Sequence, residues 1–341
     1  MKPANKLRKT VIGLVTAAAV AAGLGILVKI MGAGYFQNIL ILVGITLIAT
    51  LGVAVLTGYT GLFTIGHAGF MAVGGYMAAL LAKEAQVPFF YAVLGGGVFA
   101  GLTSFIIGYP AFRSRLRGDC FAIATLGFAE AIRLILNNVR QIGSITLGGA
   151  YGYMDLPTLD GSIWSWLPKG GWGPVIVVMA FALVIFFLTH AFVVSQWGKT
   201  CIAVGQDEVA AQMMGVNLMT TKMMALFISA LYAGLAGGLM AFYYGYLTPG
   251  FFMITRSSDL LAGVVFGGMQ SVIGPTITSA VLVAVPEGLR TFAEYRLIVY
   301  GLFFVVMMVF RPQGLMGYYR MDFSILGRLW RRREPAKAGG R

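Results

Sequence analysis

Long apolar runs alternate with short polar segments along almost the whole chain. A helix needs about 20 apolar residues to cross the hydrocarbon core of a bilayer, although a somewhat shorter run can also serve. The pattern therefore predicts an all-α polytopic membrane protein with a single transmembrane domain over residues 1–341. The ten expected spans are residues 11–31, 36–56, 62–82, 88–108, 120–139, 173–195, 223–244, 258–270, 272–288 and 297–310.

Two glycine-rich interruptions divide apolar runs in opposite halves of the chain. The first covers residues 58–61 and 66–69, and the second covers residues 263–268 together with Gly274 and Pro275. The second makes the expected eighth span only 13 residues long, so it is either a full crossing or a re-entrant segment. Paired broken helices typically mark a substrate path near the middle of the bilayer. The residues expected on this path are Thr64, Gly66, His67, Phe70, Gly267 and Gly268.

Other glycines recur at a spacing of four within the apolar runs. This spacing places them on one helix face, where the missing side chain lets two helix backbones approach closely. We expect these glycines to serve helix packing rather than to contact a ligand. The pairs are Gly97 with Gly101, Gly234 with Gly238, and Gly263 with Gly267.

The charged residues report on topology. Lys and Arg number 25 against 12 Asp and Glu, a net charge of +13, yet they occur in short segments between or beyond the apolar runs. With the amino terminus inside, most of them fall on one side, and the side rich in basic loops is the cytoplasm. We therefore expect no nucleic-acid partner. The expected segments are a cytoplasmic amino terminus at 1–10, an external loop at 140–172, a cytoplasmic segment at 198–222 and a cytoplasmic tail at 311–341 whose basic residues attract anionic lipid.

The cytoplasmic segment 198–222 carries signals for a short helix. Asp207 can cap its amino end, Glu208 favours the first turn, and Gly215 can end it. A helix this short is marginal alone, because isolated helices of fewer than about 12 residues are barely stable in water. Val209 and Met213 stand four residues apart and form part of a small apolar face, extended by Ala210 and Met214. The helix either docks in a groove on a partner protein or rests on the membrane surface.

The chain offers little material for catalysis. Only two cysteines and two histidines, His67 and His190, are present, and the histidines lie far apart in the sequence. We therefore expect neither an enzyme nor a bound metal or cofactor. Gly198-Lys199-Thr200 resembles the end of a phosphate-binding loop, but Val193 stands where that motif requires glycine. Glu130 and Arg133, three residues apart inside the fifth run, form an expected intramembrane charge pair with a structural, lining or gating role.

Several segments together resemble the permease subunit of branched-chain amino acid ABC importers, of the LivM type. The resemblance covers most of the chain from the second to the tenth span. It rests on TGYTGLFTIGHAGFMAVGGYMAALL at 57–81, RSRLRGDCFAIATLGFAEAIRLILNN at 113–138, QDEVAAQMMGVN at 206–217, FGGMQSVIGP at 266–275 and FRPQGL at 310–315.

The resemblance implies an ABC importer permease with broken helices that moves branched-chain amino acids across the cytoplasmic (inner) membrane of a prokaryote, with both termini in the cytoplasm. The implied partners are a second, homologous permease, two cytoplasmic ATPase subunits that hydrolyse ATP, and an external substrate-binding protein. The segment at 206–217 would be the coupling helix that contacts an ATPase. Its implied contact residues are Asp207, Glu208, Val209, Ala210, Ala211, Met213 and Gly215.

Some positions depart from the family pattern. Val209 separates Glu208 from the two alanines that follow that glutamate directly in the general ABC importer signature. Cys120 and Gln270 stand where an aromatic residue and a glycine are commoner. Because of these departures, urea or short-chain amides remain alternative cargoes. An ion-coupled secondary transporter is a further alternative, for which Glu130 would be the titratable group.

Overall fold

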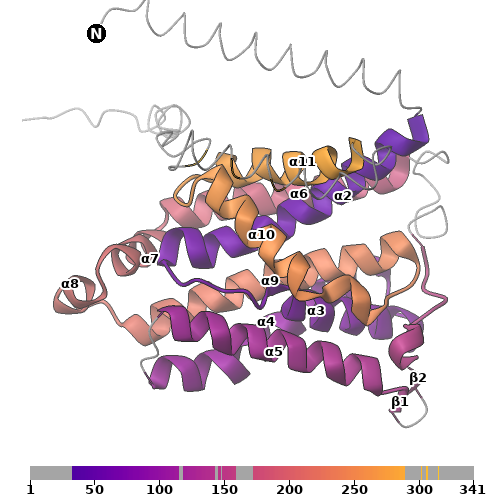
Figure 1. The fold of residues 1–341 in the computed structure, drawn as a ribbon, viewed down its shortest axis with the longest axis horizontal. Helices are drawn as coiled ribbons and strands as arrows, with labels where there is room; N and C mark the ends of the chain where they lie inside the picture. Colours follow the sequence, from indigo (N-terminus) through magenta and orange to yellow (C-terminus); the bar gives the residue numbers. More distant parts are fainter. Residues whose placement is uncertain are drawn as a thin grey trace, which may run out of the picture.

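The computed structural model describes residues 33–114, 118–142, 145–146, 148–158 and 172–288, together with residues 301, 305 and 314. Most of these residues are helical, and the long helices run side by side along the longest axis of the molecule (Figure 1). The α-helices are α2 (Ala33–Val53), α3 (His67–Lys83), α4 (Phe89–Arg113), α5 (Gly118–Asn138), α6 (Trp172–Val194), α7 (Gln196–Gln206), α8 (Glu208–Met213), α9 (Leu218–Tyr244), α10 (Ile254–Gly267) and α11 (Ile273–Gly288). The shorter elements are the π-helical turn η1 (Ala54–Tyr59), the 3-10 turns η2 (Gly149–Tyr151) and η3 (Pro249–Phe252), and the antiparallel strands β1 (Gln141–Ile142) and β2 (Ile145–Thr146).

The prediction of an all-α polytopic membrane protein is confirmed. Within the described part of the chain, four helical segments are long and apolar enough to cross a membrane: Gly34–Tyr59, Phe89–Arg113, Trp172–Val194 and Leu218–Tyr244. The expected first and last spans, the amino terminus at 1–10 and, apart from residue 314, the tail at 311–341 lie outside the described residues.

Two expected spans differ from simple helices. The apolar run at 62–82 becomes helical only at His67, because the glycine-rich segment before it continues as non-helical chain. The run that begins at 258 belongs to α10, which ends at Gly267 and is followed by a break before α11 begins at Ile273. The predicted broken helices are therefore present.

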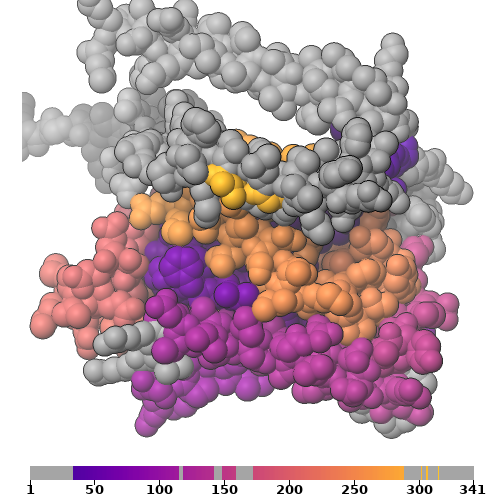
Figure 2. Space-filling view, in the orientation of Figure 1, coloured from indigo at the N-terminus to yellow at the C-terminus, as the bar shows by residue number. Residues whose placement is uncertain are grey.

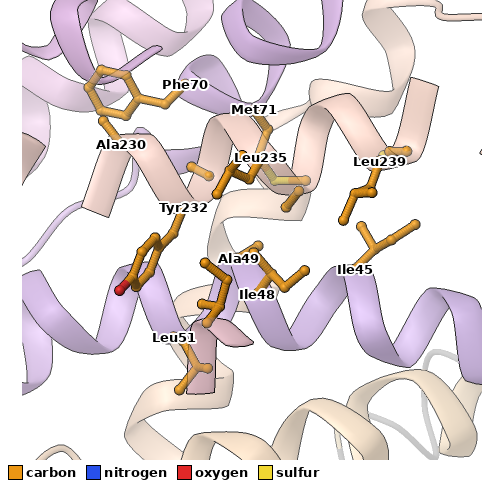
Figure 3. Close-up of a cluster of buried hydrophobic side chains, with 14 of the residues drawn as sticks. Ile45, Ile48, Ala49, Leu51, Phe70, Met71, Ala230, Tyr232, Leu235 and Leu239 are labelled. Carbon is orange, nitrogen blue, oxygen red and sulfur yellow. The ribbon is translucent and has the colours of Figure 1, made fainter. Parts of the chain in front are cut away.

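The centre of the bundle is α9, which packs against α2, α3 and α4. Figure 3 shows side chains from α2, α3 and α9 meeting in a buried cluster, with Ile48 on α2, Met71 on α3 and Leu235 on α9 among them. By contrast, α6 leaves Phe187 and Leu188 more than half exposed. Large apolar side chains on the outer surface are expected of helices that face lipid.

Glycines let α3, α4 and α9 approach each other at their backbones. A β-carbon placed at Gly74 would overlap the backbone of Gly234, and one placed at Gly96 would overlap the carbonyl oxygen of Gly74. At Gly234, an added β-carbon would also lie 3.0 Å from the Cα atom of Gly97. For Gly97 and Gly234, the sequence-based prediction of a packing role is confirmed.

The two ends of the bundle carry different structures. At one end lie α7 and α8, and at the other lies the β1–β2 hairpin (Figure 1). The segment that follows the hairpin is attached to the bundle, because the Tyr153 amide donates to the Leu247 carbonyl oxygen at 2.7 Å and the Lys83 ammonium donates to the Met154 carbonyl oxygen at 2.8 Å. This segment belongs to the expected external loop at 140–172, and whether it faces outward stays a prediction.

Candidate functional site

Helix α8 is held at its amino end by the side chain of the residue before it. The Asp207 carboxylate accepts hydrogen bonds from the backbone amides of Val209 at 2.8 Å and Ala210 at 3.0 Å. Asp207 also ends α7, so one residue separates the two helices. A cap of this kind satisfies amides that the helix cannot pair internally, and typically contributes about 1 kcal/mol.

Gly215 ends the same helix in the left-handed conformation, with a φ angle of 85°. Its amide donates to the Gln212 carbonyl at 3.0 Å, while the Val216 amide donates to the Ala211 carbonyl at 3.1 Å. These two bonds form a Schellman motif, in which a glycine reverses the chain and satisfies the last carbonyls. Both predicted ends of the helix are therefore found, within one residue.

The apolar side chains of α8 point mostly away from the bundle. Val209, Met213 and Met214 are 66%, 83% and 86% exposed, whereas Ala211 is only 5% exposed. Of the residues expected to contact a partner, Ala211 is therefore turned inward. In Figures 1 and 2 the α7–α8 segment projects from one end of the molecule. An exposed apolar surface of this kind suits both alternatives for the helix, docking on a partner protein and resting on the membrane surface.

A salt bridge joins α8 to α9 beside an open hollow. The Glu208 carboxylate lies 2.6 Å from the Lys222 ammonium, and the Lys222 side chain is only 10% exposed. The hollow has a volume of about 650 Å³ and extends to Phe112 and Arg113 at the end of α4. Helix α8 therefore borders a recess that spans three helices, with charged and apolar groups on its walls.

The two helix breaks lie against each other and against α7. A β-carbon placed at Gly58, in the π-helical turn, would overlap the carbonyl oxygen of Met269 in the break after α10. One placed at Gly61 would lie 3.3 Å from the Gly205 backbone on α7. Gly267 likewise leaves room for Gly274. The two interruptions recognised in the sequence thus form one continuous region of closely packed backbone.

Hydroxyl groups on neighbouring helices hold the first break in place. The Thr64 and Thr125 hydroxyls lie 3.2 Å apart, and the Ser257 hydroxyl accepts from the Ala68 amide at 2.8 Å. The Nε2 atom of His67 lies 2.6 Å from the Ser229 hydroxyl, which in turn donates to the Gly52 carbonyl at 2.6 Å. These bonds satisfy polar groups that would otherwise be costly to bury.

Of the six residues expected along a substrate path, four are buried around the first break. They are Thr64, Gly66, His67 and Phe70. His67 and Phe70 also make an edge-to-face ring contact, with centroids 6.3 Å apart. Gly267 is buried at the end of α10, and Gly268 follows it with a φ angle of 107°. Their role along a solute path stays a prediction.

The expected charge pair on α5 is formed. The Arg133 guanidinium donates from Nε to both carboxylate oxygens of Glu130, at 3.1 Å and 2.9 Å, and a further contact joins its Nη2 atom to Oε1. Even when paired, the side chains are 23% exposed for Arg133 and 41% exposed for Glu130. The pair therefore lies at the edge of the bundle rather than in its core.

Known proteins identify the family. The family described as "Branched-chain amino acid transport system / permease component" matches residues 35–310. The chain belongs to this permease family. The permease is 35% identical over 303 residues to LivM of Escherichia coli (strain K12), a "high-affinity branched-chain amino acid transport system permease protein". The aligned region covers 82% of this chain and 70% of that protein. The permease is 34% identical over 303 residues to LivM of Salmonella typhimurium, with the same coverage of both chains.

A more distant relative matches over most of both chains. The permease is 21% identical over 321 residues to the "probable branched-chain amino acid transport permease protein LivH" of Methanocaldococcus jannaschii, covering 87% of this chain and 94% of that protein. No solved structure matches the chain. Together with the apolar helices, the family makes this chain a multi-pass inner-membrane permease of the ABC transporter class.

Several residues of the site were not found from the sequence. Lys222 is the last residue of the predicted cytoplasmic segment 198–222, but it was not recognised as the partner of Glu208. Thr125, Ser229 and Ser257, which anchor the first break, lie on other helices, so sequence spacing could not connect them with it. The only available signal was a small polar residue inside an apolar run, where a hydroxyl needs a hydrogen-bond partner.

Proposed function

We propose that this permease moves branched-chain amino acids into the cytoplasm as one membrane subunit of an ATP-driven importer, with ATP hydrolysed by separate subunits. The observation that carries the proposal is the 35% identity to LivM over 82% of the chain. A match over 82% of the chain extends far beyond any single motif.

Helix α8 is the proposed contact for an ATPase subunit. It is capped at both ends, projects from the bundle and exposes Val209 and Met213. A short helix with fixed ends and an exposed apolar face is suited to a groove on a partner. The Glu208–Lys222 salt bridge joins it to α9, the central helix, so a displacement of α8 acts on the core of the bundle.

The remaining proposed partners follow from the same family. A second, homologous permease would cover part of the surface, and α5 offers a face for it because Ile123 and Ile135 are 71% and 54% exposed. An external substrate-binding protein would meet the end that carries the β1–β2 hairpin and Tyr153. Lipid would surround the outer apolar helices such as α6.

The cargo is the least constrained part of the proposal. The permease is also 25% identical over 265 residues to the "D-allose transport system permease protein AlsC" of Escherichia coli (strain K12), so similarity extends to a protein named for a sugar. Branched-chain amino acids are favoured because the two LivM proteins, which are named for them, are 35% and 34% identical to this chain. Urea and short-chain amides are the competing cargoes.

The test is uptake into proteoliposomes that hold this chain, its partner permease and the ATPases, supplied with binding protein and radiolabelled leucine. We expect uptake only when ATP is supplied on the side of the membrane where the ATPases are bound. Isoleucine and valine should compete with leucine, whereas urea and acetamide should not. Uptake without ATPases would contradict the proposal and indicate a channel. Uptake that stops with a protonophore while ATP is maintained would indicate an ion-coupled transporter.

A pair of matched variants tests the docking role of α8. Val209→Asp places a charge on its exposed apolar face, whereas Thr220→Asp places the same charge in the exposed first turn of α9, outside the 650 Å³ hollow. We expect Val209→Asp to reach the membrane normally but to lose at least tenfold of ATP-driven uptake, with Thr220→Asp close to wild type. Equal uptake by the two variants, at equal membrane levels, would rule out docking through this face.

A further inference from the structure

A second hollow lies beside the charge pair of α5. Its volume is about 290 Å³, and its walls come from three parts of the chain. They are the middle of α5, the end of the first break at Ile65, and residues 252–255, where η3 leads into α10. The hollow therefore lies where a broken segment and the start of the helix before the second break both approach α5.

The walls of this hollow are chemically uneven. Glu130 and Arg133 form a charged side, while Ile65, Leu126, Met253 and Ile254 form apolar walls. A charged group that faces hydrocarbon is costly even when paired, and intramembrane charges usually face a water-filled or protein-lined space. Both charged side chains line this hollow, and both are partly exposed, at 23% for Arg133 and 41% for Glu130.

The pair retains capacity for a ligand. Among the described contacts, Arg133 donates to Glu130 only from Nε and Nη2, which leaves the donors of Nη1, while a carboxylate has about four acceptor positions. A guanidinium binds a carboxylate strongly and with defined geometry, and a carboxylate binds an ammonium group. One positive and one negative group, side by side above apolar walls, are complementary to an α-amino acid with an aliphatic side chain.

The size of the hollow fits the same class of molecule. Pockets for drug-sized ligands typically measure about 300–1,000 Å³. A hollow of about 290 Å³ lies at the lower limit of that range, so it suits a single small solute. Neutral amides and sugars lack the two opposite charges that the pair would recognise.

We propose that this hollow is a binding site within the permease for one zwitterionic, aliphatic amino acid. The ligand carboxylate binds Arg133, its ammonium group binds Glu130, and its side chain lies against Ile65, Leu126 and Met253. This inference rests on the proposed function, because it assigns a site to the proposed cargo.

Ligand protection of a reporter cysteine tests the site. Met253→Cys places a thiol on the wall of the hollow, in a Cys120→Ala background that removes the exposed native cysteine. Val98→Cys on α4 is the matched control, because Val98 and Met253 are similarly exposed, at 46% and 47%, and Val98 does not line the hollow. The detergent-solubilised assembled transporter is treated with a small methanethiosulfonate reagent, with and without leucine.

We expect millimolar leucine to slow modification of Met253→Cys at least fivefold and to leave the rate for Val98→Cys unchanged. Neither 4-methylpentanoate, which lacks the ammonium group, nor isopentylamine, which lacks the carboxylate, should protect. The double variant Glu130→Gln/Arg133→Gln removes both charges together, so no unpaired charge is left to disturb folding. Protection by leucine should disappear in this background while ATP hydrolysis continues.

The outcomes separate the two proposals. If the wild-type transporter takes up leucine with ATP but leucine does not protect Met253→Cys, the binding site is refuted and the proposed function stands. Equal protection by all three compounds, or protection that persists in the double glutamine variant, also refutes recognition by the charge pair. Absence of ATP-driven uptake by the wild-type transporter would refute the proposed function itself.

Discussion

The Glu208 carboxylate on α8 and the Lys222 ammonium on α9 lie 2.6 Å apart, and the two side chains differ in exposure, at 49% and 10%. Removal of the Glu208 charge and removal of the Lys222 charge should therefore lower the stability by different amounts. Glu208→Gln leaves a nearly buried ammonium unpaired, whereas Lys222→Gln leaves a carboxylate that water can solvate. Loss of one partner costs about 3–5 kcal/mol for a buried pair, and we expect about 1–2 kcal/mol here because solvent screens the exposed side.

The measurement is the melting temperature of the purified subunit in detergent. Glu208→Gln should lower it by more than Lys222→Gln does. The double variant Glu208→Gln/Lys222→Gln is the control, because it leaves neither charge unpaired. Its melting temperature should be closer to that of the wild type. A larger drop in melting temperature for Lys222→Gln than for Glu208→Gln would show that Lys222 is not the more buried partner of the salt bridge.

Asp207 should determine how firmly the first turn of α8 is formed. Asp207→Ala removes the acceptor for the Val209 and Ala210 amides, at an expected cost of about 1 kcal/mol. Asn is an equally good cap, so Asp207→Asn should stay close to wild type. Hydrogen–deuterium exchange should be about fivefold faster across 208–214 in Asp207→Ala only, and equal rates in both variants would contradict the capping role.

Gly215 should be required for its backbone conformation alone. Its φ angle is 85°, and an added β-carbon would meet no atom within 4 Å, so steric contact with other elements is excluded among the described residues. Gly215→Ala should cost about 1–2 kcal/mol, because L-residues with a β-carbon disfavour the left-handed region. Asn tolerates that region better, so Gly215→Asn should be milder. Exchange rates across 208–214 measure the difference, and the reverse order would argue against the Schellman motif.

Substitution of a glycine at a helix–helix contact should be much more damaging than substitution of a glycine that makes no such contact. Gly74→Ala would place a methyl group into the backbone of Gly234, whereas Gly127→Ala on α5 would meet no described atom within 4 Å. We expect Gly74→Ala to reduce the yield of folded protein several-fold by gel filtration. Gly127→Ala should be neutral or stabilising by about 0.5–1 kcal/mol, since alanine favours helix more than glycine does. Similar yields for the two variants would contradict the close approach of α3 and α9.

The two cysteines should differ in reactivity. Cys120 is exposed at the start of α5, whereas Cys201 is buried on α7, in the expected cytoplasmic segment. Burial raises the pKa of the Cys201 thiol, an effect that a hydrogen bond with Thr60 partly opposes. Because the thiolate is the reactive form, a raised pKa means less reaction at a given pH, and a rise in rate only at higher pH. Mass spectrometry after N-ethylmaleimide treatment at pH 7 should find Cys120 modified first, and equal labelling would show that Cys201 is accessible.

Local signals were the most predictable part of this chain. The ends of α8 follow from Asp207 and Gly215, because caps depend on residues that are neighbours in sequence. The break before His67 and the break after Gly267 were likewise predicted from glycine clusters inside apolar runs. Helix α7, by contrast, was not foreseen as a separate helix, because it follows the apolar run at 173–195 directly and is closed by Asp207, the same residue that caps α8.

Contacts between distant segments could not be predicted. Nothing in the sequence places Ser229 beside His67, 162 residues away, or joins Lys222 to Glu208 rather than to solvent. The inward orientation of Ala211 depends on how α8 rests on its neighbours, which helix periodicity alone does not determine. The hollow beside Arg133 has the same origin, because three separate segments form its walls.

The approach of Gly61 to Gly205 has a mechanical consequence. Most contacts between helices pass through side chains, which absorb a small displacement by changing rotamer. At this contact backbone faces backbone, and Gly58 meets Met269 in the same manner a few residues away. At both contacts the glycine has no side chain that could change rotamer to absorb a displacement. A displacement of α7 would therefore be transmitted to both breaks with little attenuation.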